Sequence, residues 1–312
     1  EAIARENGIN IQEFPIVDTR DPELNSTRLK FADAFFAKRQ RKGLNYHESK
    51  KLMRDRNYFG CMMVEMGEAD AMISGLTKNY ADAIRPALQS IGVEEGVKKI
   101  AGMYLLLTKK GPLFLADTTI NFNPTAAELA EITLMVAREI GNFNITPHIA
   151  MLSYSNFGSN PSSEAKLVAE ATRIVKEKNP DLVVDGEMQA WLPFNKEVLK
   201  ENYGFSSLVD KEVNTLIFPN LTAGNVAYNL LKEVGDAELI GPILLGLKKP
   251  VHVLQLGSSV RNIVNMANIA VLDAQLKCSG HSNKALLESK YWGKLKAAMG
   301  IGSNVKTDES EV

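Results

Sequence analysis

Short apolar runs alternate along this chain with amphipathic helical segments, and this alternation limits the folds that the chain can adopt. The runs at 69–75, 100–107, 149–154, 215–218 and 251–254 predict buried strands, because each is short and mostly apolar. The segments between them carry apolar residues on one side, which is typical of helices that cover the face of a sheet. Strand–loop–helix units in series predict an α/β protein with mainly parallel sheets flanked by helices.

Other local patterns give more specific expectations. Residues 9–17 predict one more strand near a sheet edge, and residues 48–66 predict a single helix. Pro86 follows Arg85, and proline is tolerated only in the first turn of a helix or at a break. Arg85 is therefore expected near a helix start or a kink. Residues 283–299 predict a possible further helix close to the end of the chain.

Length, charge and cysteine content narrow the class of protein. A chain of 312 residues is long enough for two domains. Its 36 basic and 37 acidic side chains leave a formal net charge of −1, so no net field favours nucleic acid or an anionic membrane as a partner. No apolar run approaches the roughly 18 residues of a membrane-spanning helix. Cys61 and Cys278 cannot build a disulfide framework, so we expect a reducing, cytoplasmic setting.

Familiar catalytic and cofactor motifs are missing from the sequence. The four histidines, His47, His148, His252 and His281, are scattered without metal-ligand spacing, so no metal site is predicted. The sequence contains neither a phosphate-binding P-loop nor the glycine fingerprint of dinucleotide-binding folds. Cys61 lies in an apolar helical segment, where a core position is the better interpretation than a nucleophile.

What the sequence does contain is a set of candidate anion-binding residues. Arg39 and Arg85 can offer bidentate donors to phosphate, and the loop at Ser74 and Gly75 follows a predicted strand. Gly257, Ser258 and Ser259 precede a predicted helix, whose first turn offers free backbone N–H groups. The alternative for each arginine is a solvated surface position, and Ser259 can equally be a simple helix cap.

The order of the loops resembles that of the phosphate acetyltransferase (phosphotransacetylase) family. The resemblance runs from about Arg28 to Gln275 and rests on these runs: Ala71-Met-Ile-Ser-Gly, Asp82-Ala-Ile-Arg-Pro, Ala150-Met-Leu-Ser-Tyr-Ser-Asn, Asp185-Gly-Glu-Met, Ile217-Phe-Pro-Asn and Ile240-Gly-Pro-Ile-Leu. It implies two α/β domains with a cleft between them, as in isocitrate dehydrogenase-like folds. The first domain would comprise residues 1–100 plus 252–312 and lack its opening units, and the second would comprise residues 101–251.

That family exchanges an acetyl group between coenzyme A and phosphate, which requires a base for the thiol and donors for the anions. The resemblance implies that Arg39 and Arg85 correspond to two arginines in the upstream part of the family's sequence. After the last strand, however, Gln255, Leu256 and Asn262 stand where the family has serine, arginine and aspartate. An amide accepts no proton near neutral pH, and a lost charged hydrogen bond is worth about 1.5–3 kcal/mol. We therefore expect no catalytic residue here and no efficient acetyl transfer.

A narrower resemblance is to the C-terminal, phosphotransacetylase-like domain of long NADP-dependent malic enzymes. It rests on Glu68-Ala-Asp-Ala-Met-Ile, Asn123-Pro-Thr-Ala-Ala-Glu, Ser155-Asn-Phe-Gly-Ser and Lys249-Pro-Val-His-Val-Leu. It implies a regulatory and oligomerisation module without a cofactor of its own, which binds acetyl-CoA or CoA and forms at least a homodimer. The run Asp82-Ala-Ile-Arg85-Pro86 departs from this pattern and keeps the transferase form.

The same resemblance implies an upstream dehydrogenase that decarboxylates malate and carries NADP and a divalent metal. The chain opens at Glu1 without an initiator methionine, which agrees with this expectation.

Three hypotheses follow from the sequence. The first is a regulatory domain in which Arg39, Arg85, Ser74, Gly75 and the 257–259 helix start hold acetyl-CoA. The second is an active phosphate acetyltransferase. The third is an assembly domain without a ligand.

Overall fold

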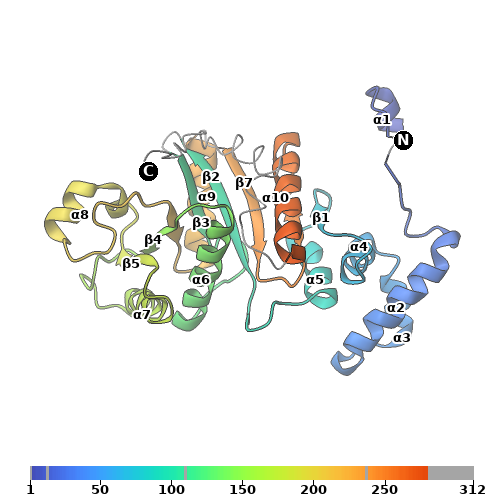
Figure 1. Ribbon diagram of the computed structural model, residues 1–312, viewed down its shortest axis with the longest axis horizontal. Helices are drawn as coiled ribbons and strands as arrows, with labels where there is room; N and C mark the ends of the chain where they lie inside the picture. Colours follow the sequence, from blue (N-terminus) through green and yellow to red (C-terminus); the bar gives the residue numbers. More distant parts are fainter. Residues whose placement is uncertain (1, 12–13, 109–110, 236–237, 280–312) are drawn as a thin grey trace, which may run out of the picture.

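The computed structural model describes residues 2–11, 14–108, 111–235 and 238–279 of the chain, and its strands form two sheets (Figure 1). The predicted helix at 283–299 and the 280–312 part of the expected first domain lie outside these described residues. The short helix α1 (Ala2–Glu6) and the 3-10 turns η1 (Pro22–Leu24) and η2 (Gln40–Lys42) belong to the N-terminal segment.

The larger sheet has six strands in the order β5-β4-β6-β3-β2-β7. The pairs β5–β4, β4–β6 and β6–β3 are parallel, whereas β2 is antiparallel to both β3 and β7. The strands are β2 (Ala101–Thr108), β3 (Gly111–Ala116), β4 (His148–Leu152), β5 (Val183–Met188), β6 (Thr215–Ile217) and β7 (Glu238–Leu245). The predicted α/β class with mainly parallel strands is confirmed.

Helices cover both faces of the six-stranded sheet. Helices α6 (Ala126–Asn142) and α7 (Ser163–Lys178) pack on one face, and α9 (Leu221–Val234) packs on the other. The 3-10 turn η3 (Leu192–Phe194) and helix α8 (Lys196–Asn202) join the core on the α9 side through buried leucines. Strand β2 is apolar along most of its length because both of its faces are buried. Met103 lies in the core beneath α6, and Tyr104 lies in the core on the other face of the sheet.

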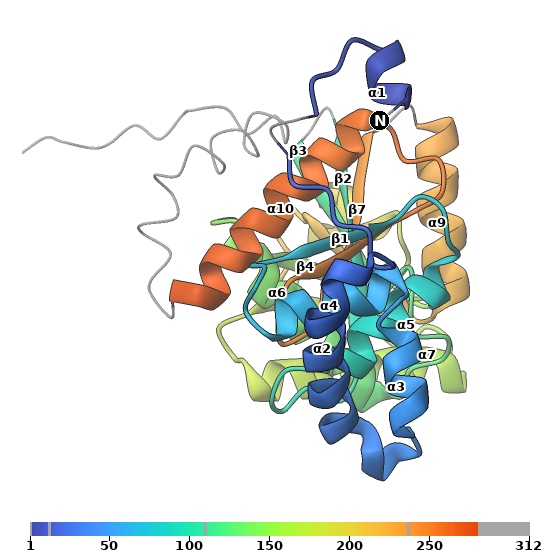
Figure 2. The ribbon, with the colours of Figure 1, turned by 90° about the vertical axis from the view of Figure 1, so that its right-hand side faces the viewer.

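The smaller sheet pairs β1 (Met72–Gly75) with β8 (Val251–Leu254) in parallel. Helices α4 (Arg56–Glu65), α5 (Tyr80–Ser90) and α10 (Val260–Ser279) pack around it, and α10 runs beside β1 (Figure 2). Helices α2 (Asn25–Arg39) and α3 (Tyr46–Leu52) form the outer layer at this end of the molecule (Figure 1).

The chain passes between the two sheets twice, through residues 91–100 and 246–250. These two connections run side by side: Val93 and Leu247 form an antiparallel bridge, and the Glu94 N–H donates to the Gly246 carbonyl at 2.8 Å. The Lys248 N–H donates to the Gly92 carbonyl at 3.1 Å. We call residues 91–100 and 246–250 the hinge. The division into domains 1–100 plus 252–312 and 101–251 stays a prediction.

The strand predicted at 9–17 is wrong for the residues described there, because 9–11 and 14–17 form no strand. The alternating pattern is present, but Ile9, Phe14 and Ile16 are exposed and pair with no other strand among the described residues. An apolar alternation makes a strand only where a sheet edge is available to pair with it.

The single helix predicted at 48–66 is also wrong, because two helices, α3 and α4, occupy this region. Asp55 separates them and caps α4 by accepting hydrogen bonds from the backbone N–H groups of Asn57 and Tyr58. An aspartate at this position competes with helix continuation by bonding to the next turn.

Arg85 lies in the middle of α5, with Pro86 inside the same helix, rather than near a helix start. The helix begins earlier, at the cap Asn79, whose side chain accepts from the Asp82 N–H at 2.9 Å. A proline removes one helical hydrogen bond, but Pro86 is buried. Packing of this helix face therefore keeps the segment helical.

The close pairing of β1 with β8 predicts a strict requirement for glycine at position 75. Gly75 has φ +112°, and a Cβ atom there would lie 2.1 Å from the Leu254 carbonyl oxygen. Gly75→Ala is expected to lower the free energy of unfolding by about 3 kcal/mol or more, measured by urea denaturation. Gly43→Ala is the control, because Gly43 also has a positive φ but open space around it, so about 1–2 kcal/mol is expected there. Equal losses would contradict the close contact.

Candidate functional site

The carboxyl ends of β1 and β8 bring together two of the segments predicted to bind phosphate. In the parallel register Ser74 lies beside Val253 and Gly75 lies beside Leu254. The chain continues from Leu254 through residues 255–259 into α10. The loop after β1 and the loop after β8 therefore stand at one edge of the sheet, where ligands of α/β proteins commonly bind.

The start of α10 is closed by its own side chains. The Ser259 hydroxyl accepts from the Asn262 N–H at 3.2 Å, and the Ser258 hydroxyl donates to the Gln255 carbonyl at 2.8 Å. Gly257 has φ +78°, which a glycine adopts without strain. Ser259 is thus a helix cap, and an anion at this position would be held by the backbone N–H groups of the first turn.

Arg85 lines a pocket of about 480 Å³ between α4, α5 and the loop after β1. A second cation, Lys78, lies in the same wall and pairs with Asp55 at 2.6 Å. Arg85 itself contacts Asp82 at 3.4 Å and is largely exposed. The pocket therefore presents an arginine and a lysine to solvent, with one carboxylate beside each.

Arg39 and Arg85 both act on Tyr58, which lines this pocket. Burial is the largest influence and raises the pKa of the Tyr58 hydroxyl, whereas the charges of Arg85 and Arg39 act to lower it. The hydroxyl donates to the Gln89 side chain at 2.5 Å. The structure thus brings the two predicted arginines close to one tyrosine, although α2 and α5 are far apart in sequence.

Polar contacts link this pocket to the sheet edge. The Ser74 hydroxyl donates to the Asn57 side-chain oxygen at 2.7 Å, and the Asn57 N–H donates to Asp55 at 2.8 Å. The Asn57 side-chain nitrogen is buried and has no hydrogen-bond partner among the residues that the structure describes. Ser74 and Gly75 therefore belong to the same polar surface as Arg85 and Lys78.

The structure also shows the surroundings of Gln255, Leu256 and Asn262, the three residues that differ from the family pattern that the sequence resembles. The Gln255 side-chain nitrogen donates to the Tyr228 hydroxyl at 3.1 Å, which ties the end of β8 to α9. Leu256 is 66% exposed, and Asn262 serves the helix cap through its N–H. These residues supply amide and apolar groups only, so none of them can act as a base.

Three tyrosines next to Gln255 were not predicted from the sequence. Tyr228 stacks on Tyr104 with ring centroids 4.5 Å apart, and the ionisation of Tyr80 is influenced by Tyr228. Burial raises the pKa of both Tyr80 and Tyr104 well above that of a free tyrosine. Among the described residues the Tyr80 hydroxyl is buried without a hydrogen-bond partner. The three rings come from α5, β2 and α9, so no local motif could have identified them.

Among the described residues, no three histidine, cysteine, aspartate or glutamate side chains are arranged to hold a metal ion. In the same part of the chain, every helix is too short or too polar to cross a bilayer.

Residues 1–271 match the family described as phosphate acetyl/butaryl transferase. The chain is 40% identical over 264 residues to the NADP-dependent malic enzyme of Haemophilus influenzae, covering 84% of this chain but 34% of that protein. It is 38% identical over 254 residues to the phosphate acetyltransferase of Bacillus subtilis, covering 81% of this chain and 78% of that protein. The chain therefore spans about a third of the malic enzyme and most of the transferase.

Solved structures of phosphotransacetylases are also similar to this chain in fold. A phosphotransacetylase from Streptococcus pyogenes superposes with a TM-score of 0.77 at 35% identity, covering 89% of this chain and 82% of that one. The EutD phosphotransacetylase from Staphylococcus aureus superposes with a TM-score of 0.76 at 28% identity, covering 88% of this chain and 82% of that one.

The unpaired Tyr80 hydroxyl generates a prediction about stability. Tyr80→Phe is expected to leave the free energy of unfolding unchanged or to raise it, because an unsatisfied buried hydroxyl costs about 1–3 kcal/mol. Tyr58→Phe is the comparison, because it loses a hydrogen bond to Gln89 and is expected to destabilise by about 1 kcal/mol. Urea denaturation of both variants is the measurement. Equal destabilisation would mean that the Tyr80 hydroxyl has a bound partner in solution.

Proposed function

Because the chain belongs to the phosphate acetyl/butaryl transferase family, we propose that it is a regulatory domain that binds acetyl-CoA or CoA and lacks efficient acetyltransferase activity. One observation carries this proposal. The two arginines suited to phosphate, Arg39 and Arg85, lie close to Tyr58 beside the sheet edge. At the same edge, Gln255 and Asn262 make structural contacts and offer no base.

The binding half of the proposal rests on charge and on backbone donors. Coenzyme A carries several phosphate oxygens, and guanidinium groups bind such oxygens in a bidentate manner. Arg85 and Lys78 line an open pocket, and the start of α10 stands at the neighbouring strand end. In this proposal Arg39 and Arg85 contact phosphates, while Ser74, Gly75 and residues 257–259 form the wall along the ligand.

The proposed lack of acetyltransferase activity rests on residues at the same edge of the sheet, where β1 and β8 end. Acetyl transfer needs a group that removes the proton of the CoA thiol. The amide of Gln255 is already bonded to Tyr228, and an asparagine at position 262 cannot accept a proton near neutral pH. A ligand held here would be bound without being converted.

We extend the proposal to the parent protein through the similarity to NADP-dependent malic enzymes. In such a protein an upstream dehydrogenase would decarboxylate malate and would carry NADP and a divalent metal. Acetyl-CoA bound to this domain would shift an oligomeric equilibrium, at least a homodimer, and inhibit the dehydrogenase. Such an effector acts only to the extent that it binds one state more tightly.

The alternative is an active phosphate acetyltransferase. It is favoured by the influence of both Arg39 and Arg85 on Tyr58 and by the similarity to the transferase of Bacillus subtilis over most of its length. The two functions differ in turnover, so they can be separated by direct measurement.

The binding prediction uses calorimetry. Acetyl-CoA is expected to bind the purified 312-residue protein, and Arg85→Ala is expected to weaken binding about 10- to 100-fold, the equivalent of one charged hydrogen bond. Arg173→Ala is the control, because Arg173 is an exposed arginine on α7 that pairs with Glu170. Absence of heat with the wild-type protein at millimolar ligand would leave the assembly domain as the remaining hypothesis.

The activity prediction uses a coupled assay for acetyl phosphate. Wild-type turnover is expected below about 1 s⁻¹, the lower end of ordinary enzyme rates. The triple variant Gln255→Ser, Leu256→Arg, Asn262→Asp restores the residue types of the family and is expected to raise turnover at least about tenfold. A wild-type rate well above about 1 s⁻¹ would support the active transferase instead.

A further inference from the structure

Helix α9 carries apolar side chains on its outer face as well as on the face that packs against the sheet. Its inner face is buried through Gly224 and Tyr228. On the outer face Val226, Leu230 and Val234 are 53%, 58% and 82% exposed. A helix that is apolar all round is typical of one that is covered on both sides, whereas α9 runs along one side of the molecule (Figure 2).

The exposed part of α9 is also poor in charge. No aspartate, glutamate, lysine or arginine occurs from residue 221 to residue 231. Helix α7, on the opposite face of the same sheet, gives the comparison, because charged side chains occupy its exposed positions, among them Glu164, Lys166, Glu170, Arg173 and Glu177. Exposed apolar residues without charges between them mark protein-interaction surfaces, whose centres are depleted of charged residues.

The start of α10 extends this surface. Val260 and Val264 are exposed one turn apart, and the exposed Leu256 precedes them in the loop after β8. Arg261, next to Val260, pairs with Glu238 at 2.8 Å, and Glu238 begins β7 four residues after the end of α9. The end of α9 and the start of α10 therefore lie near each other. We call the following six residues the apolar face: Val226, Leu230, Val234, Leu256, Val260 and Val264.

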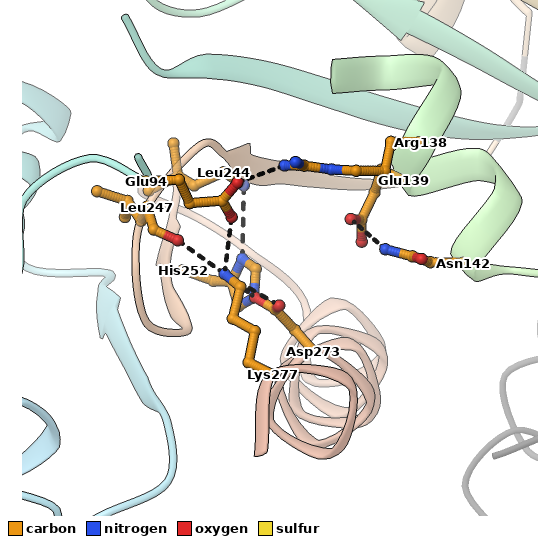
Figure 3. Close-up of polar contacts among 9 residues, drawn as sticks. All are labelled: Glu94, Arg138, Glu139, Asn142, Leu244, Leu247, His252, Asp273 and Lys277. Atoms are coloured by element: carbon orange, nitrogen blue, oxygen red, sulfur yellow. Dashed lines mark hydrogen bonds and ion pairs between the residues drawn. The ribbon is translucent and has the colours of Figure 1, made fainter. Parts of the chain in front are cut away.

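The other end of α10 is occupied by charged contacts within the molecule, as Figure 3 shows. Lys277 donates to the Leu247 carbonyl at 2.8 Å and contacts Asp273 at 3.1 Å, beside the hinge. In the same cluster Arg138 of α6 pairs with Glu94 of the hinge. The last turns of α10 are thus bound to the hinge, and the apolar face lies at the opposite end of the helix.

We propose that the apolar face binds the same face of a second copy of this chain, about a two-fold axis that passes close to Leu230. The sequence of the stripe favours a second copy over a different partner. Valines stand four residues before and four residues after Leu230, so the stripe reads the same in both directions along α9. Two antiparallel copies of α9 place Leu230 against itself and Val226 against Val234 of the second copy.

The size of the apolar face agrees with that of a dimer interface. Burial of an aliphatic side chain removes on the order of 100 Å² of apolar surface from water. Six such residues, each more than half exposed, therefore offer about 400 Å² on each copy. A stable interface buries about 800 Å² on each partner, roughly 55–65% of it apolar. The apolar face supplies most of that apolar share.

This inference deepens the proposed function, on which its regulatory meaning rests, because the interface and the candidate ligand site share α9 and α10. Tyr228, on the inner face of α9, accepts from Gln255 at the sheet edge. Leu256 and Val260 flank residues 257–259, which are proposed to line the ligand. A ligand at the start of α10 would lie next to the second copy, so it can bind one oligomeric state more tightly than the other.

The experiment measures the oligomeric state of the 312-residue protein without ligand, by sedimentation velocity over a range of concentrations. The wild-type protein is expected to be a dimer at micromolar concentration. Leu230→Lys is expected to weaken the dimer at least about 100-fold, because the two-fold axis brings two lysines to one point. Ile16→Lys is the matched control, because Ile16 is 67% exposed but lies in the N-terminal segment, and it should dimerise like wild type. Circular dichroism checks that both variants fold.

Disulfide cross-linking tests the position of the axis. In a Cys278→Ser background, Leu230→Cys is expected to form a disulfide between copies on mild oxidation, because this position meets itself at the axis. Val226→Cys alone is expected to form none, whereas Val226→Cys combined with Val234→Cys is expected to cross-link. Cys61 stays unreactive, because burial raises the pKa of its thiol to about 12.

The outcomes separate this proposal from the proposed function. A monomeric wild-type protein overturns the dimer, whether another part of the chain, a different protein or a lipid surface covers the apolar face instead. A Leu230→Lys variant that dimerises like wild type overturns it too. Calorimetry with acetyl-CoA on the same samples tests the proposed function independently, because a wild-type dimer that gives no heat would refute acetyl-CoA binding and still support the interface.

Discussion

The parallel pairing of β1 with β8 is the contact on which the arrangement of this protein depends. The two strands are about 180 residues apart in sequence, and their backbones approach so closely at Gly75 and Leu254 that no side chain fits between them. This pairing places the loop after β1 beside the loop that opens α10. It also forces the intervening chain to leave and return through two adjacent hinge segments.

The candidate site and the hinge are two consequences of the same topology. A single helix, α10, starts at the strand ends and ends beside the hinge. In the proposed function Arg39 and Arg85 bind the anion, whereas Gln255 and Asn262, which make structural contacts, offer no base. Binding without turnover is therefore the function that we propose for this edge of the sheet.

The periodicity of the sequence predicted the sheet class and most strands, because each strand of a sheet covered on both faces is apolar along its whole length. The periodicity gave a wrong prediction where the apolar pattern of a segment did not match its surroundings in the folded chain. Residues 9–17 have the alternation of a strand, but those described there (9–11 and 14–17) pair with no strand in the described part of the chain. Asp55 divides a helix whose apolar pattern continues across it. Pro86 predicts that Arg85 lies near a helix start or a kink, whereas Arg85 lies in the middle of α5, in which the buried Pro86 is also helical.

By itself the sequence determined the local structures and the chemical types available: where strands alternate with helices, which residues can bind phosphate, and that position 262 holds an amide rather than a carboxylate. Only the tertiary structure decided which groups meet. The stacking of Tyr104 on Tyr228 joins segments more than 100 residues apart. Such contacts leave no periodic signal, because they depend on how sheets and helices pack rather than on neighbouring residues.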